Sequence, residues 1–236
     1  KQVVIDRFGQ WLGTNWPGKP HNETELKRVW KMEDAQQHPD DKKTTHLTEA
    51  PFAGNATGFF HTEEHDGRWW FVDGEGAPFI SIGMDCVNMT MDTPVEGREF
   101  LFPNLLLEQH GFINYYKENI KLRYPGVTWM EQWKAAQYRR LHDWGFNTIA
   151  NWSDERFSYM PKMAFTVNAE LGRSWKRWQE FPDVYSEEFQ KSVRDEAQKK
   201  CKKYANESLL LGYFIGNEEH WADRDFIHLI LTDEKP

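Results

Sequence analysis

A glutamate follows an asparagine shortly after an apolar run near the C-terminal end of this sequence. The run covers residues 209–215, and Asn217 and Glu218 come after it, with one glycine between. A carboxylic acid placed there can protonate a departing oxygen and then activate a water molecule, as hydrolysis of a glycosidic bond requires. The adjacent amide can bind a sugar 2-hydroxyl, a contact that strengthens as the oxocarbenium ion forms. The pair predicts Glu218 as an acid/base, with Asn217 orienting the sugar.

Other polar and aromatic side chains also follow apolar runs. Residues 151–154 follow the run 146–150, residues 85–88 follow the run 78–84, and residues 220 and 221 come soon after Glu218. Amides and carboxylates can hold sugar hydroxyls, and an indole can stack on a pyranose ring. Helix capping, a rim aromatic or loop packing are the structural alternatives. The predicted substrate-binding residues are Asp85, Asn88, Asn151, Trp152, Asp154, Asn217, His220 and Trp221.

The N-terminal part of the chain predicts a linker followed by a β-hairpin. Asn22 can cap a helix, because Glu25 stands three residues later. Residues 58–64 and 68–72 flank the turn sequence Asp66-Gly67, which is typical of a hairpin. We therefore expect a linker segment over residues 1–57 and the start of a catalytic domain over residues 58–236.

Two helices are predicted in the second half of the chain. The first begins with a capping box at Thr128, has apolar residues at helical spacing from Trp129 to Trp144, and ends at Gly145. The second begins at Ser186 and carries an apolar stripe from Phe189 to Tyr204. Apolar runs before, between and after these helices give a strand–helix alternation, which indicates an α/β fold.

Four apolar runs predict parallel strands that are buried on both faces. The stretches 85–127 and 151–162 are interpreted as long loops after strand ends, where (β/α)8 barrels carry their sites. A complete barrel needs about 250 residues from its first strand. We therefore expect the first half of a (β/α)8 TIM barrel, completed by a missing C-terminal part or a second chain. The predicted strands are 78–84, 146–150, 163–167 and 209–215.

The composition argues against nucleic acid as a partner and against a membrane span, and it favours a carbohydrate ligand. The net charge of −8 argues against nucleic acid, because binding to phosphates needs clustered Lys and Arg. No apolar run reaches the roughly 20 residues of a membrane span. Aromatic residues make up 15% of the chain, a content that suits a carbohydrate ligand. Cys86 and Cys201 are predicted to be buried thiols rather than a disulfide, and no metal or cofactor is expected.

One competing motif is His61-Thr62-Glu63-Glu64-His65, which matches the H-x-x-E-H pattern of zinc peptidases. That chemistry needs a helix, so that both histidines share one face at close range. Here the segment precedes the Asp66-Gly67 turn and is expected to be a strand. The zinc peptidase is therefore kept as an alternative that metal analysis would test.

Several short segments occur together in one order along nearly the whole chain. The set and its order resemble the β-agarases of glycoside hydrolase family 50. Gly216 and Glu219 depart from the family pattern, which puts the substrate in doubt more than the type of reaction. The segments are 6–10, 16–19, 57–60, 67–73, 145–149 with 151–154, and 211–214 with 217–218.

The resemblance implies a (β/α)8 barrel and retaining hydrolysis of β-1,4-galactosidic bonds in agarose by a secreted or periplasmic bacterial enzyme. It also implies that Glu218 is the acid/base and that the nucleophile is a glutamate near strand seven, beyond Pro236. A galactan oligosaccharide or polysaccharide would be the partner. Three alternatives stay open: a β-galactosidase, a porphyran-type hydrolase on the same barrel, and a non-catalytic galactan-binding protein.

Overall fold

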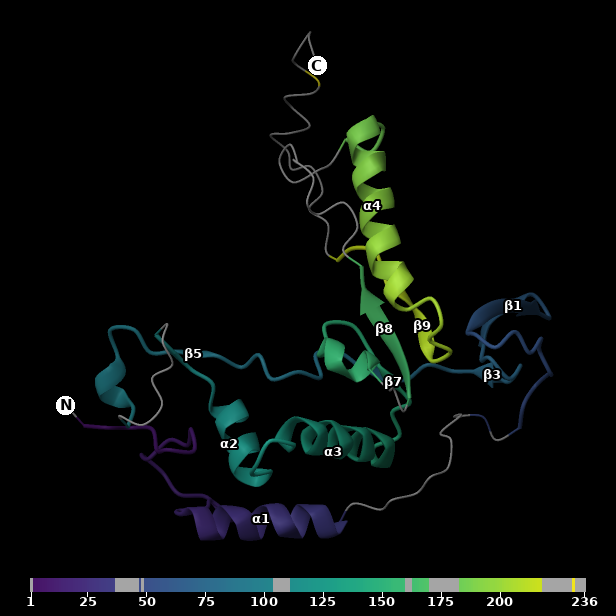
Figure 1. Ribbon diagram of the computed structural model, residues 1–236. Coiled ribbons are helices and arrows are strands. Elements are labelled where there is room, and N and C mark those ends of the chain that lie inside the picture. Colours follow the sequence, from purple (N-terminus) through teal and green to yellow (C-terminus); the bar gives the residue numbers. More distant parts are fainter. Residues whose placement is uncertain are drawn as a thin grey trace. The chain divides into compact units, whose positions relative to one another are not determined.

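The chain divides into two compact units, Lys1–Thr44 with Val87–Asn147 and Thr45–Cys86 with Thr148–Pro236. Figure 1 shows the helices and strands of both units. The structure, a computed structural model, describes residues 2–36, 47, 49–103, 111–159, 163–169, 183–217 and 231.

The first unit is mainly helical. Helix α1 spans Glu23–Gln36, α2 spans Tyr115–Arg123 and α3 spans Trp129–Asp143. The stretch 85–127, which we expected to be a loop, instead contains α2 and three short elements, so that prediction was wrong. The sequence hides α2 because just one of its nine residues, Ile120, is buried and no apolar stripe marks it. The short elements are β5 (Thr93–Pro94), the 3-10 helix η1 (Glu99–Leu101) and β6 (Phe112–Ile113), and β5 pairs antiparallel with β6.

Two helix ends of the first unit follow the predicted chemistry. The Asn22 Oδ1 accepts a hydrogen bond from the Glu25 backbone N–H at 2.9 Å, and the Glu25 carboxylate accepts one from the His21 N–H at 2.8 Å. The Asn22 side chain therefore caps α1, which confirms the predicted start of the helix, and Glu25 adds a bond to the residue before the cap. Gly145 follows α3 with a φ of +83°, a conformation that glycine adopts without a Cβ clash, and confirms the predicted end of α3.

The expectations for the start and the apolar face of α3 were partly wrong. Thr128 makes no side-chain capping bond to the backbone, and its hydroxyl instead accepts from the Gln132 amide at 3.0 Å. Trp133 and Leu141 are buried as predicted, at 1% and 3% exposure. Trp144 is 63% exposed, because the helix ends at Asp143 and the indole no longer lies on its buried face.

The second unit contains the predicted hairpin. Strand β1 (His61–His65) pairs antiparallel with β2 (Arg68–Val72), and β2 pairs with β3 (Pro78–Phe79). Asp66 and Gly67 at the turn have φ values of +52° and +72°, as a two-residue hairpin turn with matching twist requires.

The apolar run 78–84 does not form the single buried strand that we expected. Its first two residues belong to β3, and its last two form β4 (Gly83–Met84), which pairs with a different sheet. Ile80 and Ile82 lie between the two strands and are 38% and 40% exposed. The run was read as one strand because composition alone cannot show that a chain passes from one sheet to another.

Strand β4 begins a four-stranded parallel sheet in the order β4-β7-β8-β9. Consecutive strands are neighbours and all run parallel, which confirms the predicted parallel α/β arrangement. The predicted burial on both faces was wrong for β9, in which no residue is buried. The 3-10 helix η2 interrupts the stretch 151–162 that we expected to be a loop throughout. The elements are β7 (Thr148–Ile149), η2 (Glu155–Ser158), β8 (Ala164–Asn168), α4 (Glu187–Lys203) and β9 (Leu210–Phe214).

Helix α4 begins where the sequence predicts. The Ser186 hydroxyl accepts the Phe189 backbone N–H at 3.1 Å and so caps the helix. Tyr204 just beyond α4 is 6% exposed, and its ring meets Phe165 of β8 edge-on at 6.1 Å. Cys201 is half-buried and free, whereas Cys86 is free but exposed. The prediction of a buried thiol was therefore wrong for Cys86, which lies just past the end of β4 in a left-handed conformation.

Candidate functional site

The carboxyl end of β7 carries a buried amide whose polar atoms are unpaired. Asn151 is 2% exposed, and neither its Oδ1 nor its Nδ2 has a hydrogen-bond partner in the structure described above. Its backbone is fixed, because the Asn151 carbonyl accepts the Cys86 N–H at 2.9 Å. Buried polar groups are nearly always paired, since an unpaired one costs about 1–3 kcal/mol. Asn151 therefore carries one buried donor group and one buried acceptor that no described residue satisfies.

The next residue, Trp152, combines backbone strain with exposure. Its φ is +56°, a left-handed conformation that costs a residue with a Cβ roughly 1–2 kcal/mol, and its side chain is 42% exposed. Strained residues gather at functional sites. An exposed indole directly after a buried, unpaired amide is the arrangement that stacking on a sugar ring would use.

A cavity of about 250 Å³ lies at the ends of β7 and β8. Trp152 and Thr166 both line it, and the Thr166 hydroxyl is buried without a partner among the described residues. Lys200 from α4 also lines it and donates to the Asn168 carbonyl at 3.1 Å. Thr166 is not predictable from the sequence, because a threonine inside an apolar strand carries no signal that its hydroxyl lacks a partner.

Asp154 lies in the predicted place, but its carboxylate is already occupied. Its Oδ1 accepts from the Arg156 backbone N–H at 3.0 Å and from the Arg156 Nε at 2.7 Å, and its Oδ2 also contacts that guanidinium. Asp154 caps η2, which is the structural alternative that the sequence left open. A hydrogen bond from a sugar hydroxyl to Asp154 would have to use carboxylate lone pairs that do not already accept from Arg156.

The remaining predicted residues lie in different parts of the described chain or outside it. Asp85 is exposed just past β4 in the second unit, and Asn88 belongs to the first unit, where its Oδ1 accepts from the Thr90 N–H and hydroxyl at 3.0 and 2.6 Å. Asn217 is half-buried, three residues beyond β9. Glu218, His220 and Trp221 lie outside the described residues.

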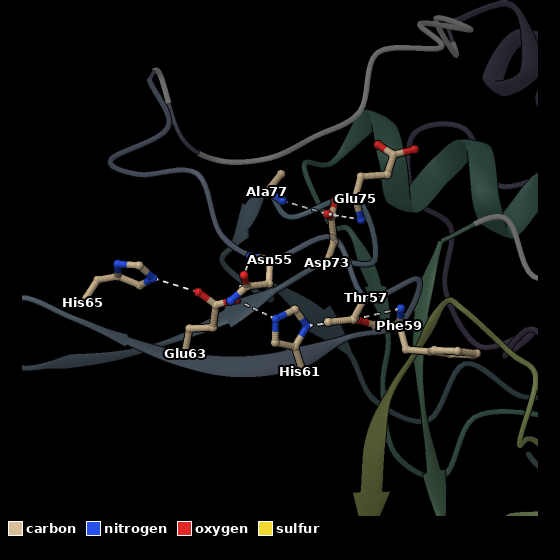
Figure 2. Close-up of polar contacts among 9 residues, drawn as sticks. All are labelled: Asn55, Thr57, Phe59, His61, Glu63, His65, Asp73, Glu75 and Ala77. Carbon is tan, nitrogen blue, oxygen red and sulfur yellow. Dashed lines mark hydrogen bonds and ion pairs between the residues drawn. The ribbon is translucent and has the colours of Figure 1, made fainter.

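The hairpin carries a dense polar cluster around Glu63 (Figure 2). The His61 Nε2 lies 2.8 Å from the Glu63 Oε1, and the His65 Nε2 lies 2.9 Å from its Oε2. The backbone N–H and side-chain amide of Asn55 donate to the same Oε1 at 2.8 and 2.9 Å. The Asn55 bond, followed by those from His65 and His61, lowers the pKa of Glu63 to about 2. The hydrogen bond to Glu63, followed by the one to the Phe59 carbonyl, raises the pKa of His61.

This cluster also places a hydroxyl, an imidazole and a carboxylate in sequence. The Thr57 hydroxyl lies 3.2 Å from the His61 Nδ1, on the side of the ring opposite Glu63 (Figure 2). The hydroxyl, however, donates its proton to the Phe59 carbonyl at 2.8 Å, and the His61 Nδ1 lies 3.1 Å from that same oxygen. The imidazole therefore holds Glu63 and the Phe59 carbonyl and does not activate the hydroxyl as a nucleophile.

The H-x-x-E-H motif has strand geometry, as expected. His61, Glu63 and His65 alternate along β1 and share one face, and each histidine turns its Nε2 to a different oxygen of Glu63. No group of three or more potential metal ligands occurs among the described residues. The helix that the zinc peptidase requires is absent from this segment, which is β1.

The fold and the β7 end together define a parallel α/β protein with a cavity at the carboxyl ends of β7 and β8, the edge at which such sheets commonly bind ligands. No family model matches the chain. β-Agarase B of Vibrio sp. (strain JT0107) is 26% identical over 274 aligned residues, which cover 93% of this chain and 28% of that enzyme. β-Agarase A of the same strain is 22% identical over 200 residues, which cover 68% of this chain and 20% of that enzyme.

Solved structures show the same similarity. The agarase AgWH50C has a TM-score of 0.79 at 24% identity, with 94% of this chain and 39% of that chain covered. An exo-β-agarase has a TM-score of 0.76 at 21% identity, with 95% of this chain and 40% of that chain covered. The resemblance to the β-agarases is thereby confirmed along nearly the whole chain, and the fold is shared with these structures. The chain spans 28% and 39% of the lengths of the first relative and the first structure.

One further structural finding concerns membranes. Among the helices of the described ranges, none has the length and apolar character to cross a bilayer.

Proposed function

We propose that this chain is part of a glycoside hydrolase that cleaves β-galactosidic bonds in a galactan such as agarose. Its similarity to β-agarases supports this function. The observation that carries the proposal is the unpaired, 2% exposed amide of Asn151 at the carboxyl end of β7, beside the exposed Trp152. A sugar hydroxyl both donates and accepts, so it can satisfy both polar atoms of the amide, and an adjacent indole can stack on the ring.

The chemistry we propose is a retaining double displacement. Glu218 protonates the departing glycosidic oxygen, and Asn217 holds the 2-hydroxyl as the oxocarbenium ion develops. A second carboxylate, from a later strand of the complete protein, attacks the anomeric carbon and forms a covalent intermediate. Glu218 then deprotonates the water that releases the sugar. The two carboxyl groups of a retaining enzyme stand roughly 5–5.5 Å apart, close enough for their mutual repulsion to raise the pKa of the acid.

The architecture that goes with this mechanism is also a proposal. Strands β4, β7, β8 and β9 would be the first four strands of a (β/α)8 barrel, since their sequential parallel order is the one that such a barrel uses. Residues 1–57 would be the linker before residues 58–236, the first half of the catalytic domain. The complete enzyme would act outside the cytoplasm, secreted or periplasmic, because agarose is too large a polymer to enter a cell.

The other predicted residues would shape the substrate site. Trp152 would form one stacking wall, and Trp221 a second. His220, Asp85 and Asn88 would contact sugar hydroxyls at the mouth. Asp154 would contribute through Arg156, by holding η2 in place next to the cavity.

The test is the Glu218→Gln variant of the full-length protein, assayed on agarose and on defined agaro-oligosaccharides. Loss of the acid should reduce kcat by about 10²–10⁴-fold while oligosaccharide binding is retained. Glu219→Gln is the matched control, because it makes the same change one residue away and should leave kcat nearly unchanged.

Three outcomes would change the proposal. Unaltered activity in Glu218→Gln would remove Glu218 from the mechanism. Hydrolysis of porphyran or of simple β-galactosides, but not of agarose, would keep the mechanism and change the substrate. Binding of galactan without any hydrolysis by the unmodified full-length protein would indicate a non-catalytic binding protein.

A further inference from the structure

A second cavity, of about 200 Å³, lies in the first unit among α1, α2 and α3. Trp30, Tyr116, Tyr124 and Trp133 give it aromatic walls. Trp133 is 1% exposed and Tyr116 is 37% exposed, so the cavity has both a buried wall and a wall that solvent reaches. An engineered cavity of about 150 Å³ is known to take up benzene. The volume therefore suffices for one six-membered ring.

Hydrogen-bond donors are in surplus around this cavity. The Arg123 Nε–H is buried without an acceptor among the described residues, although Nη1 and Nη2 bond Glu33 and Asp34 at 2.9 and 2.6 Å. Gln137 is 9% exposed and lines the cavity; its Oε1 accepts from Arg140 at 3.3 Å, and its amide nitrogen is a further donor on the cavity wall. A ligand that satisfies this cavity must therefore be rich in acceptor oxygens.

The hydroxyl of Tyr116 adds to this surplus. It accepts the Trp133 indole N–H at 3.2 Å, so its own proton is directed to a further acceptor. A ligand with acceptor oxygens could therefore accept hydrogen bonds from the Tyr116 hydroxyl, the Gln137 amide and the Arg123 guanidinium, while its apolar face packs against the aromatic rings.

The charges near the cavity favour a neutral ligand. Arg123 is paired with Glu33 and Asp34, at 2.9 and 2.6 Å, and Arg140 adds one more positive charge. The two guanidinium groups and the two carboxylates balance. An anion bound at Arg123 would lie close to the Glu33 and Asp34 carboxylates and be repelled by them, whereas a neutral ligand meets no such repulsion and leaves both ion pairs intact.

We propose that this cavity binds a single neutral pyranose, a galactose unit, at a site separate from the residues proposed for hydrolysis. A pyranose has an apolar C–H face for the rings and oxygens for the Tyr116, Arg123 and Gln137 donors. The choice of galactose rests on the proposed function, whereas the pyranose class rests on the cavity itself. All residues that line the cavity lie in the first unit, and none is a predicted catalytic or substrate-binding residue.

The experiment uses the full-length protein in two measurements. Crystals soaked in galactose should show a sugar ring in the cavity, with an oxygen at hydrogen-bond distance from the Gln137 Nε2. In titration calorimetry with galactose, Gln137→Leu should weaken this binding roughly tenfold, because a buried hydrogen bond is lost and an apolar side chain takes the place of the amide. Gln132→Leu is the control, since Gln132 is exposed on the same helix and bonds Thr128; its affinity should equal that of the wild type.

Binding and hydrolysis are measured separately, so that failure of this site can be distinguished from failure of the proposed function. Tyr116→Phe, which removes one donor and keeps the ring, serves as a second variant if Gln137→Leu does not fold. Agarose hydrolysis by either variant should match the wild type, which assigns the lost binding to the cavity and not to the catalytic site. A wild type that binds the sugar here but hydrolyses no galactan would refute the proposed function and keep the site. Ordered water alone in the soaked crystals, or equal affinity in Gln137→Leu and wild type, would refute the site.

Discussion

The hairpin and the carboxyl end of β7 differ in whether their polar side chains are hydrogen-bonded within the protein. Around Glu63, every hydrogen bond described above joins two groups of the protein itself, and both carboxylate oxygens are occupied. At Asn151, a side chain that is more deeply buried than Glu63 has no partner in the described structure, and the Thr166 hydroxyl also lacks one. The hairpin cluster pairs its polar groups internally, whereas the β7 end has a buried donor and buried acceptors without partners among the described residues.

This difference distinguishes a structural cluster from the proposed binding site. A fully paired network fixes a local conformation, in this case that of residues 52–57 against β1. An unpaired buried group lowers stability and is retained where a partner completes it. The contrast makes opposite predictions for substitutions in the two regions, since one region should affect stability and the other should affect turnover.

The largest effect is expected at Asn151. Asn151→Leu keeps the branched shape of the side chain with a modest increase in volume and removes two unpaired polar atoms, so the free energy of unfolding should be unchanged or higher by about 1 kcal/mol. Turnover of agaro-oligosaccharides should fall by about 10²-fold, as after loss of one preorganised donor. Thr166→Val should show the same pattern with a smaller fall. Thermal melts and steady-state kinetics on the full-length protein check both; a marked loss of stability with normal kinetics would reverse the assignment of this region.

A smaller effect of the opposite kind is expected at Glu63. Glu63→Gln weakens its bonds to Asn55, His61 and His65, so the melting temperature should fall by a few degrees while kcat and KM stay at wild-type values. Glu64→Gln is the matched control, because Glu64 is exposed on the other face of β1. Equal melting temperatures for the two variants would mean that the cluster does not stabilise the hairpin.

The smallest effect is a dependence of stability on pH. The raised pKa of His61 contributes stability that is complete below its ordinary value of 6.5 and is lost as the pH rises through the folded value. The lowered pKa of Glu63 contributes stability above its ordinary value of 4.5, lost as the pH falls through about 2. The contribution of the cluster should therefore be greatest between about pH 4.5 and 6.5. Melting temperatures measured from pH 4 to 9 should decline less steeply above pH 6.5 in His61→Gln, and parallel curves for the two proteins would contradict this.

Local signals gave the fold most reliably. Asn22, the Asp66-Gly67 turn and Gly145 set backbone geometry through their own chemistry, so the sequence predicts the elements that they begin or end. Elements decided by tertiary contacts were missed. The helix α2 has one buried residue, and the division of the run 78–84 between two sheets depends on partners far along the chain.

The sequence predicts which residue types occur at the candidate site, but it does not predict their hydrogen bonding or their backbone conformation. Asn151 and Trp152 were named because they follow an apolar run, and the structure adds that the amide is unpaired and the tryptophan strained. The sequence could not distinguish Asp154 as a cap from Asp154 as a ligand, because that depends on where Arg156 turns. Thr166 carried no sequence signal at all.

The central claim is that the side chain of Asn151 is unpaired because a sugar completes it. A crystal structure of the full-length protein, with Glu218→Gln and a bound agaro-oligosaccharide, tests this directly. We predict a sugar oxygen at about 2.7–3.2 Å from the Asn151 Nδ2 or Oδ1. An Asn151 side chain bonded to another part of the protein, with the oligosaccharide elsewhere, would contradict the account.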